Sequence, residues 1–140
     1  MDTTENTPGV PQFQINRWAE ESEQGKLHVE PGARPVQMAH SDATGLPLVK
    51  HNSFGADVIR FEPGKGIMEH THMGDSIVFV ISGSGYIKHE GTEHTLAPGL
   101  CCLIPSMNKH AIRATTELVI IVVGNNHQAL DSKDVLHSSK

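Results

Sequence analysis

The 140-residue chain has room for one domain but not for two separate cores. Hydrophobic residues make up 37% of it and aromatic residues 4%, which indicates a real core surrounded by much polar chain. The net charge is −5, and the Lys and Arg residues are scattered along the sequence. They form no basic stripe that could meet a phosphate backbone, so we expect no nucleic-acid partner.

The sequence also gives no indication of a membrane or secretory role. Residues 1–20 have no cationic start and no apolar run, so we expect no secretory signal. No stretch approaches the ~18 apolar residues that a membrane-spanning helix needs. We therefore expect a cytoplasmic protein with no membrane partner.

Composition divides the chain into three segments. Residues 1–35 are polar and acidic, and we expect a weakly ordered arm in which Trp18–Lys26 forms a helical turn or two at most. Residues 36–124 carry most of the apolar sequence and form the expected domain. Residues 125–140 are a polar tail.

Short extended segments separated by turn residues fill the expected domain. The breaks include Pro63-Gly64, Gly83-Ser84-Gly85 and Pro98-Gly99, and no helical period lies between them. Many short strands at this spacing predict an all-β fold, either a sandwich or a barrel. The expected strands are Val36–His40, Leu46–His51, Ala56–Glu62, Ile67–His72, Ser76–Ser82, Gly85–His89, Thr92–Leu96, Leu100–Ile104, Ala111–Ala114 and Leu118–Val123.

Two of these strands are apolar on both faces. They are Ile77–Ile81 and Leu118–Val123. A strand with one solvent-exposed face would instead alternate apolar and polar residues. Burial on both faces needs a second layer outside the sheet. A symmetric partner or the N-terminal arm could supply it, and we favour a homodimer.

His70 and His72 are the first candidates for a binding site. Two residues apart on a strand, both imidazoles would project from one face and could reach one metal ion. The chain has ten His residues, so the spacing alone is weak evidence. A set of core histidines without a metal is the competing interpretation.

The surrounding sequence strengthens the metal interpretation. The segment from Pro63-Gly64 through His70-Thr71-His72 to the apolar strand ending at Gly83 resembles the first signature of the cupin superfamily. The segment from Pro98-Gly99 through Pro105 to His110 resembles the second signature, in the expected order. The resemblance implies a single-domain cupin or jelly-roll β-barrel, a double-stranded antiparallel β-helix. It also implies that His110 is the third metal ligand beside His70 and His72.

Three positions depart from the cupin pattern. Ser76 stands where the family has a carboxylate ligand, and Asp75 is one place away. Met107 replaces a glycine in the loop before His110, and Ala114 replaces an asparagine after it. The expected site is therefore three histidines with an uncertain fourth ligand.

Three neutral imidazoles with open positions suit one divalent metal ion. Zinc or iron is favoured, and nickel, manganese or copper would also be held. We expect a metal-dependent enzyme acting on a small polar substrate, because three-histidine sites without the glutamate occur among dioxygenases of the family. A metal-assisted lyase or isomerase is equally compatible. The alternative is a non-enzymatic cupin that binds a small ligand or a metal.

Two further residues are candidates for catalysis. Asp75 borders the expected pocket and could act in acid–base chemistry, or it could stabilise the turn after Gly74. Tyr86 is the only tyrosine, and it could line the pocket or merely pack. The adjacent Cys101 and Cys102 would point to opposite faces of a strand and could not easily form a disulfide with each other. We interpret them as two small core residues in a reducing compartment, with a redox role as the alternative.

Overall fold

Short β-strands make up the regular structure of the chain. The computed structural model describes residues 13–15, 17–21, 23–25, 27–29, 34–35, 42–52 and 54–125. No helix among these residues is long and apolar enough to cross a membrane. The strands are β1 (Ala19–Glu21), β2 (Leu27–Val29), β3 (Arg34–Pro35), β4 (Thr44–His51), β5 (Phe54–Phe61), β6 (Gly66–His70), β7 (Ser76–Ser82), β8 (Gly85–His89), β9 (Thr92–Leu96), β10 (Cys101–Ile104), β11 (His110–Ala114) and β12 (Leu118–Asn125).

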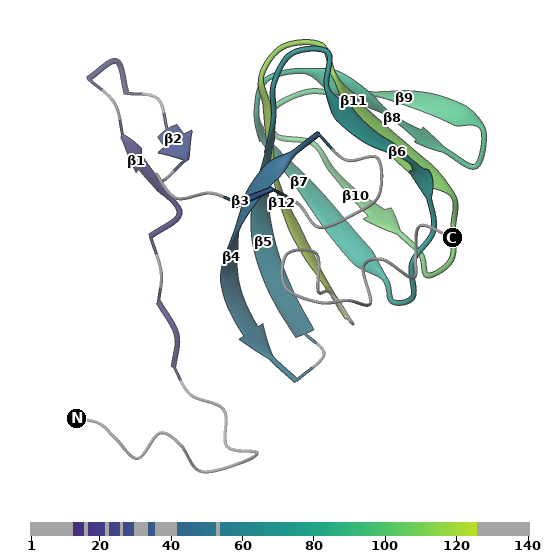
Figure 1. Cartoon of the computed structure of the whole chain (residues 1–140), viewed down its shortest axis with the longest axis horizontal. Helices are drawn as coiled ribbons and strands as arrows, with labels where there is room; N and C mark the ends of the chain where they lie inside the picture. The colour runs from purple at the N-terminus through teal and green to yellow at the C-terminus, as the bar shows by residue number, and fades with distance from the viewer. Residues whose placement is uncertain are drawn as a thin grey trace.

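Two antiparallel sheets form the body of the molecule (Figure 1). The large sheet has the order β10-β7-β12-β5-β4-β3, and the small sheet has the order β6-β11-β8-β9. In the large sheet, β12 pairs along its whole length with β5 and also pairs with β7. The chain therefore has the all-β jelly-roll architecture that the turn spacing predicts.

The two sheets enclose one apolar core. Alternate residues of strands such as β7 and β11 point inward, and the core draws on both sheets, as with Val78, Ile120 and Ile112. Phe61, Leu96 and Leu118 are fully buried. Burial of such side chains stabilises the fold by about 1.5–3 kcal/mol each.

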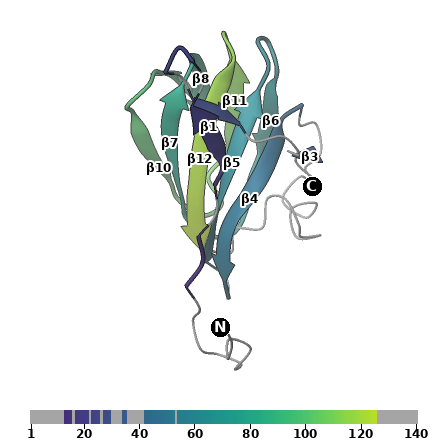
Figure 2. The same ribbon diagram turned by 90° about the vertical axis from the view of Figure 1, so that its left-hand side faces the viewer.

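The strands meet at one closed end of the barrel. The loop from β5 to β6 is tied to the end of β11, because Gly64 N donates to Ala114 O at 2.9 Å and Ala114 N donates to Lys65 O at 2.8 Å. Figures 1 and 2 show these connections gathered at the top of the view. The opposite end, where β6 ends and β11 begins, is called the open end below.

The outer face of β7 is less covered than the sequence predicts. Ile77 is 38% exposed and Phe79 is 40% exposed, so burial on both faces is not achieved within the described residues. The neighbouring Leu103 of β10 is 62% exposed on the same face. A homodimer that covers this face stays a prediction.

The N-terminal segment forms a strand pair instead of the expected helical turn. β1 pairs antiparallel with β2, and Gly25 in the intervening turn has a φ of 78°, which favours chain reversal. The helical prediction for Trp18–Lys26 is therefore wrong. Before this pair, the side-chain amide of Gln14 both donates to the backbone of Lys50 and accepts from it, at 2.9 and 3.1 Å.

Other expectations fall on residues that the structure does not describe. The strand expected at Val36–His40 and the tail beyond residue 125 lie outside the described residues. Much of the expected N-terminal arm also lies outside them. The segment boundaries at residues 35 and 124 stay predictions.

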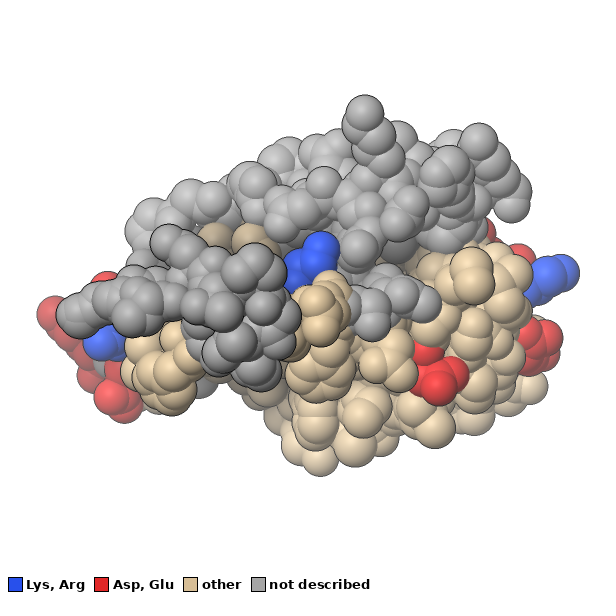
Figure 3. Space-filling view, turned by 90° about the horizontal axis from the view of Figure 1, so that it is seen from below, with Lys and Arg blue, Asp and Glu red and all other residues tan. Residues whose placement is uncertain are grey.

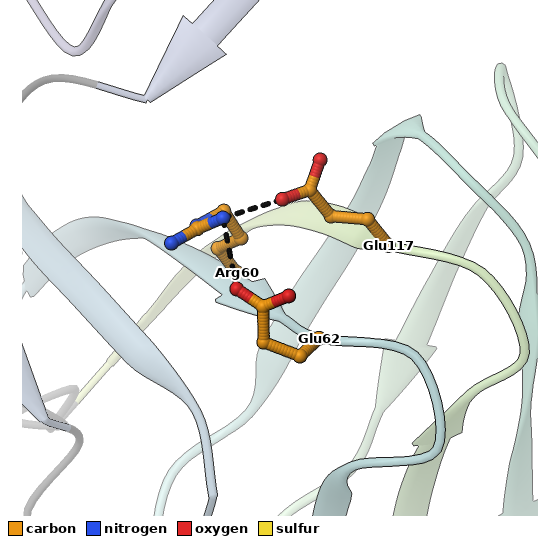
Figure 4. A network of polar contacts seen from close by, with 3 residues as sticks. All are labelled: Arg60, Glu62 and Glu117. Atoms are coloured by element: carbon orange, nitrogen blue, oxygen red, sulfur yellow. Dashed lines mark hydrogen bonds and ion pairs between the residues drawn. The ribbon is translucent and has the colours of Figure 1, made fainter.

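A small network of charged side chains joins two strands of the large sheet. Arg60 contacts Glu117 and lies 3.1 Å from Glu62, which ties β5 to the start of β12 (Figure 4). These groups are partly exposed, so each pair contributes at most about 1 kcal/mol. Figure 3 shows acidic side chains gathered at the left end of the molecule with a basic one beside them, and a few separate charged groups on the rest of the described surface.

Candidate metal centre

Three histidines from two separate parts of the chain converge at the open end. They are His70 at the end of β6, His72 in the following loop and His110 at the start of β11. One possible ligand atom from each lies within 4.8 Å of the other two. The ring centroids are 4.3 Å apart for His70 and His110, 5.0 Å for His72 and His110, and 5.8 Å for His70 and His72.

A β-bulge aims His70 into the barrel. His70 pairs with His110 and Ile67 pairs with Ile112, so two residues of β6 lie opposite one residue of β11. Both Ile67 and His70 consequently face the interior although they are three residues apart. The strand ends at His70. The prediction that it continues to His72 is wrong.

Backbone carbonyls fix the orientation of the imidazoles. Nδ1 of His70 donates to the carbonyl of Met68 at 2.8 Å, and Nδ1 of His110 donates to that of Asn108 at 2.9 Å. In His72, Nδ1 lies 3.4 Å from the carbonyl oxygen of Met73. A carbonyl cannot donate a proton, so Nδ1 carries the hydrogen and Nε2 presents the lone pair. Metal-binding histidines commonly have this arrangement.

The local environment keeps two of these imidazoles neutral. Burial lowers the pKa of His110 to about 3, and the neighbouring His70 contributes to the shift. Burial also lowers the pKa of His70, against a raising effect of its hydrogen bond to Met68. A neutral imidazole is the form that binds a metal.

The donor set therefore fits a divalent transition metal. Three Nε2 atoms in reach of one point match zinc, iron, nickel or copper, all of which accept imidazole. The described residues place no carboxylate in this cluster. A magnesium or calcium ion is disfavoured, because those ions require oxygen ligands.

Ser76 occupies the position where the family pattern has a carboxylate. It is only 2% exposed and begins β7 beside the buried Ile104. On its other side it pairs with Gly124 of β12. The register places Ser76 on the inward face of the large sheet at the open end, so this position can reach the interior.

Asp75 lies in the loop next to the cluster and joins two loops. Its Oδ1 accepts a hydrogen bond of 2.8 Å from the backbone N–H of Ser106, and Gly74 N donates to Ser106 Oγ at 3.0 Å. The loop after β6 is thereby tied to the loop before β11. This contact is a positioning role, and acid–base catalysis by Asp75 stays a prediction.

The structure does not bring Tyr86 to the cluster. Tyr86 pairs with Arg113 and lies between the inward-facing Gly85 and Ile87, which places it on the outer face of the small sheet. The prediction that both cysteines are core residues is wrong for Cys101. Cys101 is exposed, Cys102 packs against the core, and burial raises the pKa of the Cys102 thiol.

Sequence reasoning missed one residue that supports His110. His89 lies opposite His110 in the register of β8 and β11, and its Nε2 accepts a hydrogen bond of 2.8 Å from the Asn108 side-chain amide. Asn108 thus contacts both histidines, since its carbonyl accepts from His110. No sequence signal identifies this link, because it depends on the pairing of β8 with β11.

A second missed residue is Asp57 of β5. It is 5% exposed, and every other described acidic residue with an assigned burial is exposed. It pairs with Val122, a core residue, and so faces the barrel interior. The available signal was a single acidic residue within the otherwise apolar run Ala56–Ile59.

The chain is similar to known proteins in its sequence pattern and in its fold. A model of the cupin domain matches residues 57–124, and no curated protein sequence matches the chain. The solved polyketide cyclase RemF from Streptomyces resistomycificus is 17% identical with a TM-score of 0.63, over 74% of this chain and 82% of that one. A predicted oxalate decarboxylase from Thermotoga maritima is 21% identical with a TM-score of 0.60, over 67% and 93% of the two chains.

A third solved relative is larger. It is salicylate 1,2-dioxygenase from Pseudaminobacter salicylatoxidans, with 16% identity and a TM-score of 0.56, over 59% of this chain and 26% of that one. At these identities the likeness shows the fold alone. Together with the two-sheet barrel, the matched model identifies residues 57–124 as a cupin domain.

Proposed function

We propose that this protein is a metal-dependent enzyme that acts on a small polar molecule inside the barrel. The observation that carries the proposal is the convergence of three imidazoles whose Nδ1 atoms face backbone carbonyls. One ligand atom from each of His70, His72 and His110 lies within 4.8 Å of the other two, so the three rings could share one ion. Histidines that merely fill a core do not need this shared orientation.

The three Nε2 atoms would hold one divalent ion, with iron or zinc favoured. When bound, such an ion supplies a Lewis acid that polarises a substrate oxygen or lowers the pKa of water. The remaining chain holds the ligands in place and excludes solvent. Ile67 and Ile112 pack below the histidines, and the Asp75–Ser106 contact ties the two ligand-bearing loops together.

Two reaction classes are proposed, a dioxygenase and a metal-assisted lyase or isomerase. The names of the solved relatives include a dioxygenase, a predicted decarboxylase and a cyclase, and all three share this fold. A fold shared by such different activities supports metal chemistry more than any one reaction. The open positions beside three histidines favour a substrate that binds directly to the metal.

The first test is elemental analysis of protein purified without a histidine tag. We expect about one metal ion per chain, lost in both His70→Ala and His110→Ala. His94→Ala is the matched control, because His94 is exposed on β9 and outside the cluster. Wild-type protein that neither contains metal nor takes it up on reconstitution would contradict the proposal.

The metal found also separates the two reaction classes. Iron would favour oxygen chemistry, whereas zinc would favour the lyase or isomerase class, because zinc has no redox activity. If the protein is an iron dioxygenase, replacing iron by zinc should abolish turnover. If it is a zinc-dependent lyase or isomerase, other divalent ions should restore part of the turnover that is lost when zinc is removed.

One observation favours the alternative of a non-enzymatic binding module. The described metal cluster contains no acidic ligand, and Ser76 stands at the carboxylate position. Loss of that ligand is one step by which a cupin could become a binding or storage protein. Metal that binds but does not change the reactivity of any tested substrate class would support this alternative.

A further inference from the structure

Asp57 is the one buried acidic residue among those whose burial the structure describes. A buried carboxylate is costly unless it receives hydrogen bonds, so proteins rarely keep one inside a barrel without a use. Asp57 has an interaction within the chain. A carboxyl group can take part in more than one hydrogen bond at a time.

The register shows that Asp57 faces the barrel interior. Asp57 pairs with Val122, and Val122 pairs in turn with Val78 on the next strand. Val78 and Val122 are both core residues, so the three side chains point to the same side of the large sheet. The flanking Val58 is absent from this core cluster, as expected for the opposite face.

Counted in residues along their strands, Asp57 and His110 lie equally far from the closed end. Phe61 and Ala114 both lie at the closed end, where the β5–β6 loop is tied to β11. Asp57 is four residues from Phe61 along β5, and His110 is four residues from Ala114 along β11. Both strands thus advance by about 13 Å toward the open end before each polar side chain is reached.

The two side chains also belong to facing sheets. His110 faces inward from the small sheet, and Asp57 faces inward from the large sheet. Packed sheets lie about 10 Å apart, which is close to the length of a small polar metabolite. A molecule held at the histidines could therefore reach Asp57 with its far end.

We propose that Asp57 is a substrate-binding residue that accepts a hydrogen bond from a donor group at the far end of the substrate. The substrate class is a small molecule with a metal-coordinating group at one end and a protonated amine or a hydroxyl at the other. This inference rests on the proposed metal site. It deepens that proposal, because the three histidines alone set no requirement for the far end.

The test uses the full-length chain loaded with cobalt(II), whose visible absorption changes when a carboxylate coordinates. The probes are β-alanine, 3-hydroxypropionate and butyrate, which have the same number of heavy atoms and end in ammonium, hydroxyl and methyl. Glycine, 4-aminobutanoate and 5-aminopentanoate, each with its methyl-ended counterpart, vary the length. The variants are Asp57→Asn, which keeps the shape, and Asp42→Asn, an exposed aspartate that controls for the lost charge.

In wild-type protein, one donor-ended probe should bind roughly tenfold or more tightly than its methyl-ended counterpart, as expected for a hydrogen bond to a charged group. Asp57→Asn should remove most of that preference, and Asp42→Asn should keep it. Preference for the amine or for the hydroxyl identifies which donor the site takes. The inference would be overturned, even if Asp57→Asn fails to fold, by equal binding in wild-type protein of the three endings at the length of β-alanine and of the amine- and methyl-ended probes at every other length.

A preference that persists unchanged in a folded Asp57→Asn variant would also overturn it and leave Asp57 with a structural role. The cobalt spectrum before any probe is added reports on the metal site separately. Missing cobalt bands in wild-type protein would contradict the proposed function and the inference together. Normal bands without a donor preference would contradict the inference alone.

Discussion

The backbone N–H of Met107 donates a hydrogen bond of 2.8 Å to the carbonyl of His72, so the loop before His110 is fastened to the loop that carries another candidate ligand. Met107 makes this contact with a φ of 67°, in the left-handed region that favours glycine. The cupin pattern has a glycine at this position. The chain thus adopts a conformation that favours glycine while placing a long side chain there.

We expect Met107→Gly to stabilise the protein slightly. Relief of the left-handed strain contributes about 1–2 kcal/mol, and the greater freedom of glycine in the unfolded chain offsets about 0.4–1 kcal/mol of it. The Met107 side chain is 56% exposed, so little packing is lost. Urea unfolding measures the difference, with Met107→Ala as the control that keeps the strain. A Gly variant less stable than the Ala variant would contradict this explanation.

Asp75→Asn should weaken metal binding more than it weakens the fold. The amide can still accept from Ser106 N, but it loses the charge that strengthens this hydrogen bond between the two loops. We expect a several-fold rise in the dissociation constant for zinc, with a shift in unfolding midpoint of only a few degrees at most. Competition with a chromophoric chelator measures the first quantity. If Asp75→Asn leaves the zinc affinity unchanged but removes one of the pH-dependent transitions of the reaction rate, acid–base catalysis by Asp75 is favoured instead.

The metal-free protein should lose stability as the pH falls below the ordinary histidine range. Burial lowers the folded-state pKa of His110 to about 3, and that of His70 is also lowered. In the unfolded chain both groups take up protons near pH 6.5, whereas the folded chain does not. Unfolding is therefore favoured progressively from about pH 6.5 down toward pH 3, and no change from these groups is expected above pH 7.5.

Urea unfolding of chelator-treated protein at a series of pH values tests this expectation. The variant His110→Gln should show a shallower dependence, because it removes the group with the largest shift. His94→Gln is the matched control, since His94 is exposed. Identical slopes for wild type and His110→Gln would contradict the assignment of the effect to His110.

The exposed apolar face of the large sheet should be covered by a second copy of the chain. Ile77, Phe79 and Leu103 share one outer face of β7 and β10, and none of the three carries a charge. Exposed patches of this kind mark interaction surfaces in many soluble proteins. We expect a dimer by light scattering at micromolar concentration, and a monomer for Leu103→Glu. Thr92→Glu, on the exposed β9, is the control. A wild-type monomer would contradict the dimer.

Sequence patterns predicted most of the barrel because glycine and proline mark its turns. Strands β7, β8 and β9 have the bounds expected from the turns that flank them. The three histidines were also identified from their motifs, and the structure brings them together. Local signals sufficed here, since each motif lies within one strand and its adjoining loop.

Features that depend on strand register could not be predicted in the same way. The bulge that turns His70 inward is a property of how β6 pairs with β11, and neither strand alone encodes it. The same holds for His89 beside His110. Asp57 was missed because β5 is apolar at the positions on both sides of it, so alternation did not show which face is buried.

Ser76→Glu should give the site the acidic ligand that the family pattern contains. Ser76 is buried on the inward face at the open end, so a longer acidic side chain would extend toward the interior where the histidines converge. A carboxylate adds a negative ligand to three neutral ones, and we expect zinc or iron to bind at least tenfold more tightly. Ser76→Gln is the control, because it has the same length without the charge.

The same variant should reduce the binding of small carboxylates at the metal. If a substrate coordinates through positions that the missing carboxylate leaves open, the new ligand competes with it. We therefore expect butyrate and its donor-ended counterparts to perturb the cobalt(II) spectrum of Ser76→Glu only weakly. Tighter metal binding with undiminished probe binding would show that the substrate position is separate from that of Ser76. Unchanged metal affinity in a folded variant would show that residue 76 does not reach the metal at all.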